Sequence, residues 1–78
     1  MTNKITIYTR QGCIQCKMTK VFLNNIKQEY TEIDLDKNQA ILERFKNEGF
    51  FATPIVEITG QEIFTGFHPE ILTKLSNY

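Results

Sequence analysis

Alternation of hydrophobic and polar residues gives way to a helical period early in the chain. Residues 5–8 alternate isoleucine with threonine and tyrosine, which is typical of a β-strand, and a polar loop ending at Gly12 follows. Beyond it, hydrophobic residues recur every three or four positions, as on one face of a helix: Met18, Val21, Phe22 and Ile26. The pattern predicts a strand and then a helix of about 14 residues that begins at Cys13 and turns this face to the interior.

The middle of the chain repeats this change of period. Residues 30–35 alternate again and predict a second strand, and residues 36–38 carry side chains that favour turns and helix starts. A second helix follows, and we expect it to end near Gly49, because glycine readily adopts the left-handed conformation of a helix C-terminus. Its apolar face comprises Ile41, Leu42 and Phe45.

The last third of the chain predicts a hairpin and a short helix. Residues 55–59 form the first expected strand, Gly60-Gln61 the tight turn, and residues 62–65 the partner strand. Pro69 suits the first position of a final helix, and Glu70 is favourable in its first turn. The hydrophobic residues of that helix share one face: Ile71, Leu72 and Leu75.

The order of predicted elements is strand, helix, strand, helix, strand, strand, helix. A strand-helix-strand beginning implies a parallel pair joined by a right-handed crossover, and the later hairpin adds two antiparallel strands. The sequence therefore predicts an α/β fold with a four-stranded mixed sheet flanked by three helices. A chain of 78 residues has room for one domain, which we expect to span residues 1–78.

Composition excludes several classes of function. Nine basic and nine acidic residues give a net charge of +0, so no bulk attraction to nucleic acid or anionic lipid is expected. No apolar run approaches the ~18 residues of a membrane span, and the N-terminal residues lack the pattern of a secretory signal. Two cysteines are too few for a secreted disulfide scaffold. We therefore expect a cytoplasmic protein that binds neither nucleic acid nor a membrane, and we also expect it to be a monomer.

Cys13 and Cys16 carry the candidate chemistry. Residues three apart on a helix share one face, so the two sulfurs can form a disulfide with little backbone movement. Unpaired N–H groups of the first turn and the positive end of the helix dipole favour a thiolate, the attacking species in disulfide exchange. Because Cys13 lies at the helix start and Cys16 one turn inside, we expect Cys13 to attack a substrate disulfide and Cys16 to resolve the mixed disulfide.

Two other interpretations of the cysteine pair stay open. A structural zinc site needs four ligands, and His68 is the only further imidazole or thiol in the sequence, so such a site would have to be shared between chains. The cysteines could also be incidental core residues, although their place between a strand and a helix disfavours that interpretation. The sequence favours a redox pair with no metal and no bound organic cofactor.

Thr53-Pro54 is the second candidate feature. Proline cannot donate to a strand ladder, yet this one directly precedes a clear strand. A cis bond here would leave backbone groups that face the cysteines and hydrogen-bond an extended substrate. Taken alone, a proline at a strand start is more often only structural.

With this element order, the chain resembles the thioredoxin-fold family, and in particular its glutaredoxin-like redoxins of the NrdH-redoxin type, which donate hydrogen to class Ib ribonucleotide reductase. Residues 13–16, Cys-Ile-Gln-Cys, resemble that branch's Cys-x-Gln-Cys, where dithiol glutaredoxins tend to have Cys-Pro-Tyr-Cys. Residues 53–56 resemble the cis-proline segment, and residues 65–70 resemble the branch's Ser-Gly-Phe-Arg-Pro-Asp sequence. The resemblance implies a thioredoxin fold and a thiol–disulfide oxidoreductase, with six residues at the substrate: Gln15, Thr53, Pro54, Gly66, Phe67 and His68.

Residues 65–70 also bear on the reductant. In glutaredoxins that use glutathione, backbone N–H groups and a carboxylate at this helix start hold the tripeptide, whereas this chain has Phe67 and Pro69, and proline has no N–H to offer. The resemblance therefore implies thioredoxin reductase, which draws on NADPH, as reductant, and a cysteine pair of the ribonucleotide reductase large subunit as acceptor. A glutathione-dependent glutaredoxin and a redox-sensing or zinc-linked binding module are the alternatives.

Some positions depart from the branch or have two interpretations. Thr65 stands for Ser, His68 for Arg and Glu70 for Asp, and the histidine lacks the permanently charged fork of arginine. Phe50 and Phe51 fit either the core or a docking surface for the reductase.

Overall fold

The computed structural model describes residues 4–76, with side chains for residues 4–74. The elements follow the predicted order, with two short 3₁₀ turns added: β1 Ile5–Thr9, α1 Ile14–Asn25, β2 Thr31–Asp34, a 3₁₀ turn Leu35–Lys37, α2 Gln39–Asn47, β3 Ile55–Ile58, β4 Phe64–Thr65, α3 Pro69–Leu72 and a 3₁₀ turn Thr73–Ser76. Pro69 is at the start of α3, with Glu70 in its first turn, as predicted. The side chain of Leu75, assigned above to the apolar face of this helix, lies outside the described residues.

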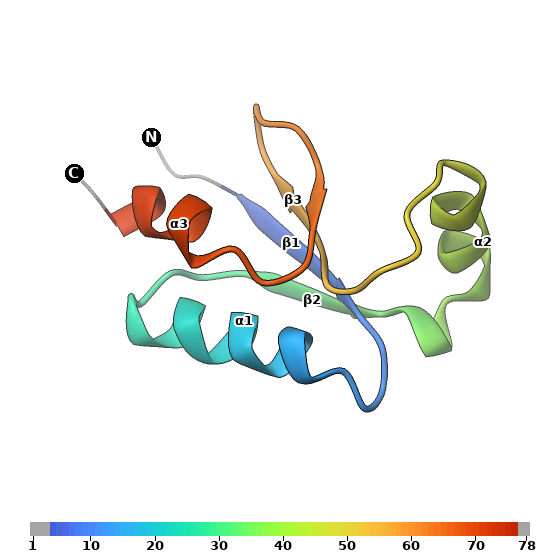
Figure 1. The fold of residues 1–78 in the computed structure, drawn as a ribbon, viewed down its shortest axis with the longest axis horizontal. Helices are drawn as coiled ribbons and strands as arrows, with labels where there is room; N and C mark the ends of the chain where they lie inside the picture. The colour runs from blue at the N-terminus through green and yellow to red at the C-terminus, as the bar shows by residue number, and fades with distance from the viewer. Residues whose placement is uncertain (1–3, 77–78) are drawn as a thin grey trace.

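The four strands form one mixed sheet in the order β2-β1-β3-β4. Strand β1 pairs in parallel with β2, where Ile7 lies opposite Glu32, and antiparallel with β3, where Ile7 lies opposite Val56. The crossover through α1 and the later hairpin are both visible in the ribbon (Figure 1). The predicted α/β architecture is confirmed.

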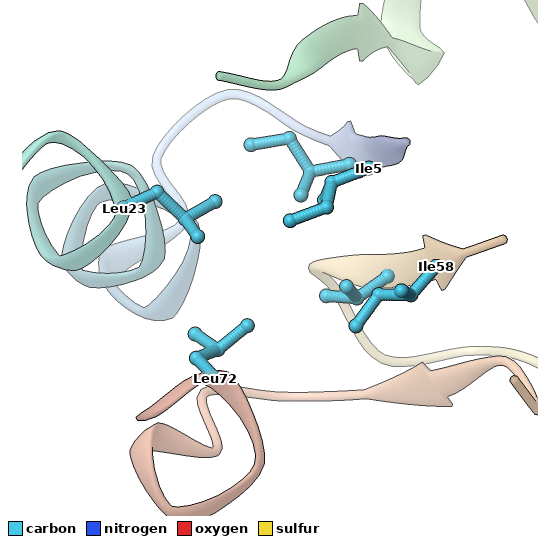
Figure 2. Packing of buried hydrophobic residues seen from close by; sticks show 6 residues of the cluster. Ile5, Leu23, Ile58 and Leu72 are labelled. Atoms are coloured by element: carbon cyan, nitrogen blue, oxygen red, sulfur yellow. The ribbon is translucent and has the colours of Figure 1, made fainter. Parts of the chain in front are cut away.

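Alternating side chains of the strands divide the core into two clusters. On one face of the sheet, Leu23 of α1 and Leu72 of α3 point toward Ile5 and Ile58 of the strands (Figure 2). On the other face, the buried residues of α2 pack against the sheet: Leu42 and Phe45 meet Tyr8, Leu35 and Ile55. Helices α1 and α3 therefore cover one face and α2 covers the other, which buries both faces of the sheet.

The predicted buried face of α1 is wrong in part. Met18 and Val21 are 44% and 50% exposed, while Leu23, Cys16 and Thr19 are buried. The Thr19 hydroxyl donates to the Gln15 carbonyl at 2.8 Å, so this polar side chain is buried with its hydrogen bond made. The hydrophobic pattern missed this face because two of its three positions are held by cysteine and threonine.

The predicted register of the hairpin is wrong by one residue. A two-residue turn at Gly60-Gln61 would place Val56 opposite Thr65, but Val56 lies opposite Phe64. The turn instead closes with the Gln61 N–H donating to the Ile58 carbonyl at 3.0 Å, and β4 covers only Phe64–Thr65. This register places Phe64 on the same side of the sheet as Val56, where it packs against the cluster between α1 and α3.

Helix α2 ends just before Gly49, near the predicted position. Gly49 has φ +90°, its N–H donates to the Lys46 carbonyl at 3.0 Å, and the Phe50 N–H donates to the Phe45 carbonyl at 2.9 Å. The Phe45 and Phe50 rings lie 5.8 Å apart edge to face, which adds the hydrophobic contact typical of this termination. Phe50 therefore belongs to the core, whereas Phe51 is 77% exposed.

Among the described residues, no helix has the length and apolar composition needed to cross a membrane.

Candidate active site

The first turn of α1 positions the two cysteines differently. Cys13 is the N-cap residue, with extended backbone at φ −94° and ψ 108°, and its Sγ accepts a hydrogen bond from the Cys16 N–H at 3.1 Å. The cap leaves Cys13 outside the helix and Cys16 at its third position. The difference expected from the sequence is confirmed.

The two cysteines are joined by a disulfide, with 5.2 Å between their Cα atoms. Cys13 is half-buried, whereas Cys16 is 2% exposed. An incoming sulfur can reach Cys13 from solvent, but the packing of α1 against the sheet shields Cys16. This difference in access fits the order of attack expected for a redox pair.

Thr53 brings a distant segment against Cys13. Its Oγ1 donates to Cys13 Sγ at 3.3 Å, and its carbonyl oxygen lies 3.5 Å from the same sulfur. The Thr53–Pro54 peptide bond is cis. Thr53, one of the predicted substrate residues, therefore lies directly at the redox sulfur.

The turn after β4 is fixed to both of these segments. The Gly66 N–H donates to the Pro54 carbonyl at 2.9 Å, and the Phe67 N–H donates to Gln15 Oε1 at 3.0 Å. Gly66 has φ +88°, a conformation that favours glycine, and a Cβ there would lie 3.2 Å from Gln15 Oε1, so the turn packs closely against this side chain. The structure thus brings four of the predicted residues together in one network of hydrogen bonds.

His68 is held within its own segment. Its Nε2 lies 2.9 Å from the Thr65 carbonyl oxygen and its Nδ1 lies 2.9 Å from Glu70 Oε2, while its ring meets Phe64 edge to face. A carbonyl and a carboxylate both accept hydrogen bonds, so each ring nitrogen of His68 faces an acceptor. The hydrogen bond from His68 lowers the pKa of Glu70 from its ordinary value. The His68–Glu70 pair lies at the position where the branch has Arg and Asp.

Charged side chains line an open hollow of about 480 Å³ on another side of the two cysteines. Glu32 accepts from the Thr9 hydroxyl at 2.8 Å and from Lys20 Nζ at 3.1 Å. Burial raises the pKa of Glu32, but these hydrogen bonds outweigh it, so the pKa lies below its ordinary value. Lys20 is thereby engaged with a carboxylate. Lys17 also lines the hollow, and within the described part of the chain it forms no ion pair.

Asp36 holds the loop that leads to Cys13. It accepts from the Gln11 N–H at 2.9 Å and from Nε and Nη2 of Arg10, at 3.0 and 2.8 Å. The backbone hydrogen bond from Gln11, followed by that from Arg10, lowers the pKa of this partly exposed carboxyl from its ordinary value. Sequence reasoning placed Asp36 in a turn but missed its contact with the loop, because the contact joins the ends of two neighbouring strands.

Within the described residues, no group of three or more histidine, cysteine, aspartate or glutamate side chains is arranged to hold a metal ion. His68 and the cysteines therefore do not form a shared cluster in this chain.

Comparison with known proteins agrees with this geometry. The family model for glutaredoxin matches residues 5–63. The glutaredoxin-like protein NrdH of Lactococcus lactis subsp. cremoris is 36% identical over 73 residues, which cover 92% of this chain and 99% of that protein. The protein of the same name from Escherichia coli K12 is 35% identical over 72 residues, which cover 92% of this chain and 88% of that protein.

Solved structures show the same fold. The glutaredoxin-like protein NrdH-redoxin from Escherichia coli matches with a TM-score of 0.85 and 33% identity, over 92% of this chain and 93% of that chain. A glutaredoxin from Archaeoglobus fulgidus, at 24% identity, shares the fold with a TM-score of 0.71, over 95% of this chain and 86% of that one. These likenesses confirm the thioredoxin fold expected from the sequence. The chain therefore belongs to the glutaredoxin family, in its NrdH-like branch, and is a thiol–disulfide oxidoreductase.

Proposed function

We propose that the protein is a cytoplasmic, monomeric electron donor that reduces protein disulfides, with the large subunit of class Ib ribonucleotide reductase as its main client. Thioredoxin reductase, supplied by NADPH, returns it to the dithiol form. The observation that carries the proposal is the unequal access of the two sulfurs: Cys13 is half-buried at the helix N-cap and Cys16 is 2% exposed.

The reaction follows from this difference in access. In the reduced protein, the Cys13 thiolate attacks one sulfur of the client disulfide, forms a mixed disulfide and releases the client's other sulfur as a thiolate. The Cys16 thiolate, held in the same helical turn, then attacks Cys13 Sγ and releases the second client thiolate. The client gains two electrons, and the protein is left with the Cys13–Cys16 disulfide, which is the bond observed here.

The turn at residues 65–68 supports a protein reductant over glutathione. The Phe67 N–H already donates to Gln15 Oε1, and Pro69 has no N–H. This turn therefore has few free donors for the carboxylates of a small peptide. Of the relatives, the Escherichia coli NrdH-redoxin is described as having a thioredoxin-like activity profile. We propose that an extended client segment lies along Thr53, Pro54 and the turn from Gly66 to His68, with Gln15 holding that turn in place.

Trapping tests which cysteine attacks. We expect the Cys16→Ser variant to accumulate a mixed disulfide with an oxidised client, because the attacking thiol remains and the resolving thiol is lost. The Cys13→Ser variant is the matched control and should trap nothing. Mass spectrometry of the adduct identifies the linked cysteine, and trapping by Cys13→Ser alone would contradict the assignment.

A coupled assay tests the reductant. NADPH oxidation in the presence of a disulfide client should be fast with thioredoxin reductase and slow with glutathione and glutathione reductase. The opposite result would identify a glutathione-dependent glutaredoxin. Failure of both reductants, together with stoichiometric zinc in freshly purified protein, would identify a zinc-linked binding module.

The reduction potential tests the direction of electron flow. A donor of this type should lie near the thioredoxin value of about −270 mV, below the glutaredoxin range of about −200 to −230 mV. A value near that of a dedicated oxidant, about −120 mV, would contradict the donor role.

A further inference from the structure

We propose that the hydroxyl group of Thr53 is a catalytic group that donates a hydrogen bond to the Cys13 thiolate and stabilises it during disulfide exchange. The inference rests on the proposed function, in which Cys13 is the attacking thiol. It assigns a chemical role to the Thr53 side chain, beyond any contact that its backbone makes with a client.

Two donors converge on Cys13 Sγ from separate elements. The Cys16 N–H lies 3.1 Å away in the first turn of α1, and Thr53 Oγ1 lies 3.3 Å away in the segment before β3. Both distances are within the range of hydrogen bonds to sulfur. The half-buried position of Cys13 keeps these contacts partly shielded from water, where a hydrogen bond to a charged atom is stronger.

The two polar groups of Thr53 act in opposite directions on Cys13. The carbonyl oxygen, 3.5 Å from Sγ, can only accept, so it favours the protonated thiol. The hydroxyl group donates and favours the thiolate. Once the thiol proton is lost, the hydroxyl is the one of these two Thr53 groups that still forms a favourable hydrogen bond with the sulfur. It therefore offsets the repulsion between the thiolate and the Thr53 carbonyl.

The stabilised thiolate appears twice in the catalytic cycle. It is the nucleophile that attacks the client disulfide, where a new S–S bond to Cys13 forms and the client's S–S bond breaks. It is also the leaving group when the reductase resolves its mixed disulfide with Cys13: a reductase thiolate forms the reductase's own disulfide, and the electron pair returns to Cys13 Sγ. The Thr53 hydroxyl contacts the reacting sulfur in both steps.

Other charges near Cys13 do not depend on Thr53. The hollow beside the cysteines is lined by Arg10, which is paired with Asp36, by Lys20, which is paired with Glu32, and by Asp34 and Lys17. On the side of β3 and β4, the ionisable pair is His68 and Glu70, whose contact is internal to that segment. A substitution at Thr53 alters none of these groups. Their effect on the ionisation of Cys13 is therefore the same in every variant and drops out of the comparison.

The test is a titration of the single thiol in the Cys16→Ser background, which keeps the residue 16 N–H donor. Thr53→Val and Thr53→Ala both remove the hydroxyl, and Thr53→Ser keeps it. Thiolate absorbance is followed against pH, and circular dichroism checks that each variant is folded. We expect the midpoint of ionisation to rise by about one pH unit in the Val and Ala variants and to stay unchanged in the Ser variant. A rise of one unit means a thiolate fraction about tenfold smaller at any pH below the midpoint.

Any other pattern overturns the inference. An unchanged midpoint in Val and Ala would show that the hydroxyl does not stabilise the thiolate. An equal rise in Ser, Val and Ala would show that the effect follows any substitution at residue 53 and not the loss of the hydroxyl. If only one of Val and Ala folds, that variant and Ser decide the result.

A separate measurement keeps this result apart from the proposed function. Wild-type reduced protein is alkylated with iodoacetamide, and mass spectrometry shows which cysteine reacts first. Preferential labelling of Cys16 would contradict the order of attack itself. Labelling of Cys13 with no shift in the Thr53 variants would contradict only the role of the hydroxyl.

Discussion

Gln15 Oε1 accepts the Phe67 N–H at 3.0 Å, although 52 positions separate the two residues in the sequence. Gly66, next to Phe67, donates to the Pro54 carbonyl at 2.9 Å. The turn before α3 is therefore held on one side by the redox motif and on the other by the segment that contacts Cys13. These two hydrogen bonds join the three segments.

Gln15→Ala removes the acceptor of the Phe67 N–H. Because the contact is exposed and water can replace it, we expect the free energy of unfolding to fall by only about 0.5–1.5 kcal/mol. Activity should fall several-fold, since the turn is no longer fixed to the redox motif. Urea denaturation and the thioredoxin reductase assay measure the two effects.

Gln15→Glu is the matched control, because a carboxylate still accepts the Phe67 N–H. It should retain most of the stability and activity lost in Gln15→Ala. Equal losses in both variants would show that the side-chain amide, and not the accepted hydrogen bond, is what the site requires.

Gly66→Ala tests the close packing of the same turn. Gly66 has φ +88°, and the added Cβ would lie 3.2 Å from Gln15 Oε1 and 3.5 Å from His68 Nε2. We expect a loss of about 2 kcal/mol or more in the free energy of unfolding, about 1 kcal/mol of it from the left-handed backbone.

Gly60→Ala isolates the part of this loss that comes from backbone strain. Gly60 has φ +83°, and a Cβ there meets nothing within 4 Å. It should cost about 1 kcal/mol, from the backbone conformation alone. The difference between the two variants in chemical denaturation measures the steric contact, and equal losses would show that Gln15 and His68 move aside without cost.

The redox pair could be predicted because its signal is local. Cys13 and Cys16 are three residues apart, and the change from alternating to helical spacing placed them at a helix start. The approach of Thr53-Pro54 to the cysteines was also expected. The hydrogen bonds from the Thr53 hydroxyl to Cys13 and from the Phe67 N–H to Gln15 could not be predicted, since both depend on how the sheet packs distant segments together.

The errors have equally specific causes. The hydrophobic pattern gave weight to Met18 and Val21 and none to Thr19, which is buried because its hydroxyl bonds the backbone one turn earlier. The register of the hairpin depended on the number of residues in its turn. Turn chemistry predicted where the chain reverses but left the register open by one position, and the burial of Phe64 beside Val56 decided it.

Lys27→Gly should stabilise the protein. Lys27 follows the C-cap of α1 and has φ +58°. Its N–H donates to the Asn24 carbonyl at 3.1 Å, and the Gln28 N–H donates to the Leu23 carbonyl at 2.9 Å. Glycine adopts this conformation without the steric cost of a Cβ, which is about 1–2 kcal/mol, but loses more chain entropy on folding. We expect a net gain of about 0.5–1 kcal/mol in the free energy of unfolding.

Lys46→Gly is the control for this gain. Lys46 lies inside α2, where glycine is less favourable than other residues, and the substitution should cost about 0.5–1 kcal/mol. Urea denaturation of both variants should therefore give effects of opposite sign. A loss of stability in Lys27→Gly would show that the Lys27 side chain contributes more than its backbone conformation costs.

Asp36 should make part of the protein's stability depend on pH in the acid range. Its pKa is lowered below the ordinary value of 3.8 by the hydrogen bonds from the Gln11 N–H and Arg10, so the unfolded chain takes up the proton first as the pH falls. The contribution is therefore fully present above the unfolded pKa and is lost as the pH falls through the folded pKa. Asp36→Asn should flatten the fall in the free energy of unfolding from about pH 5 downward. Glu43→Gln, which removes an exposed carboxylate of α2, is the control and should not flatten this fall. Denaturation curves at a series of pH values measure this slope, and an unchanged acid slope in Asp36→Asn would show that the contact between Asp36 and the loop before Cys13 does not persist in solution.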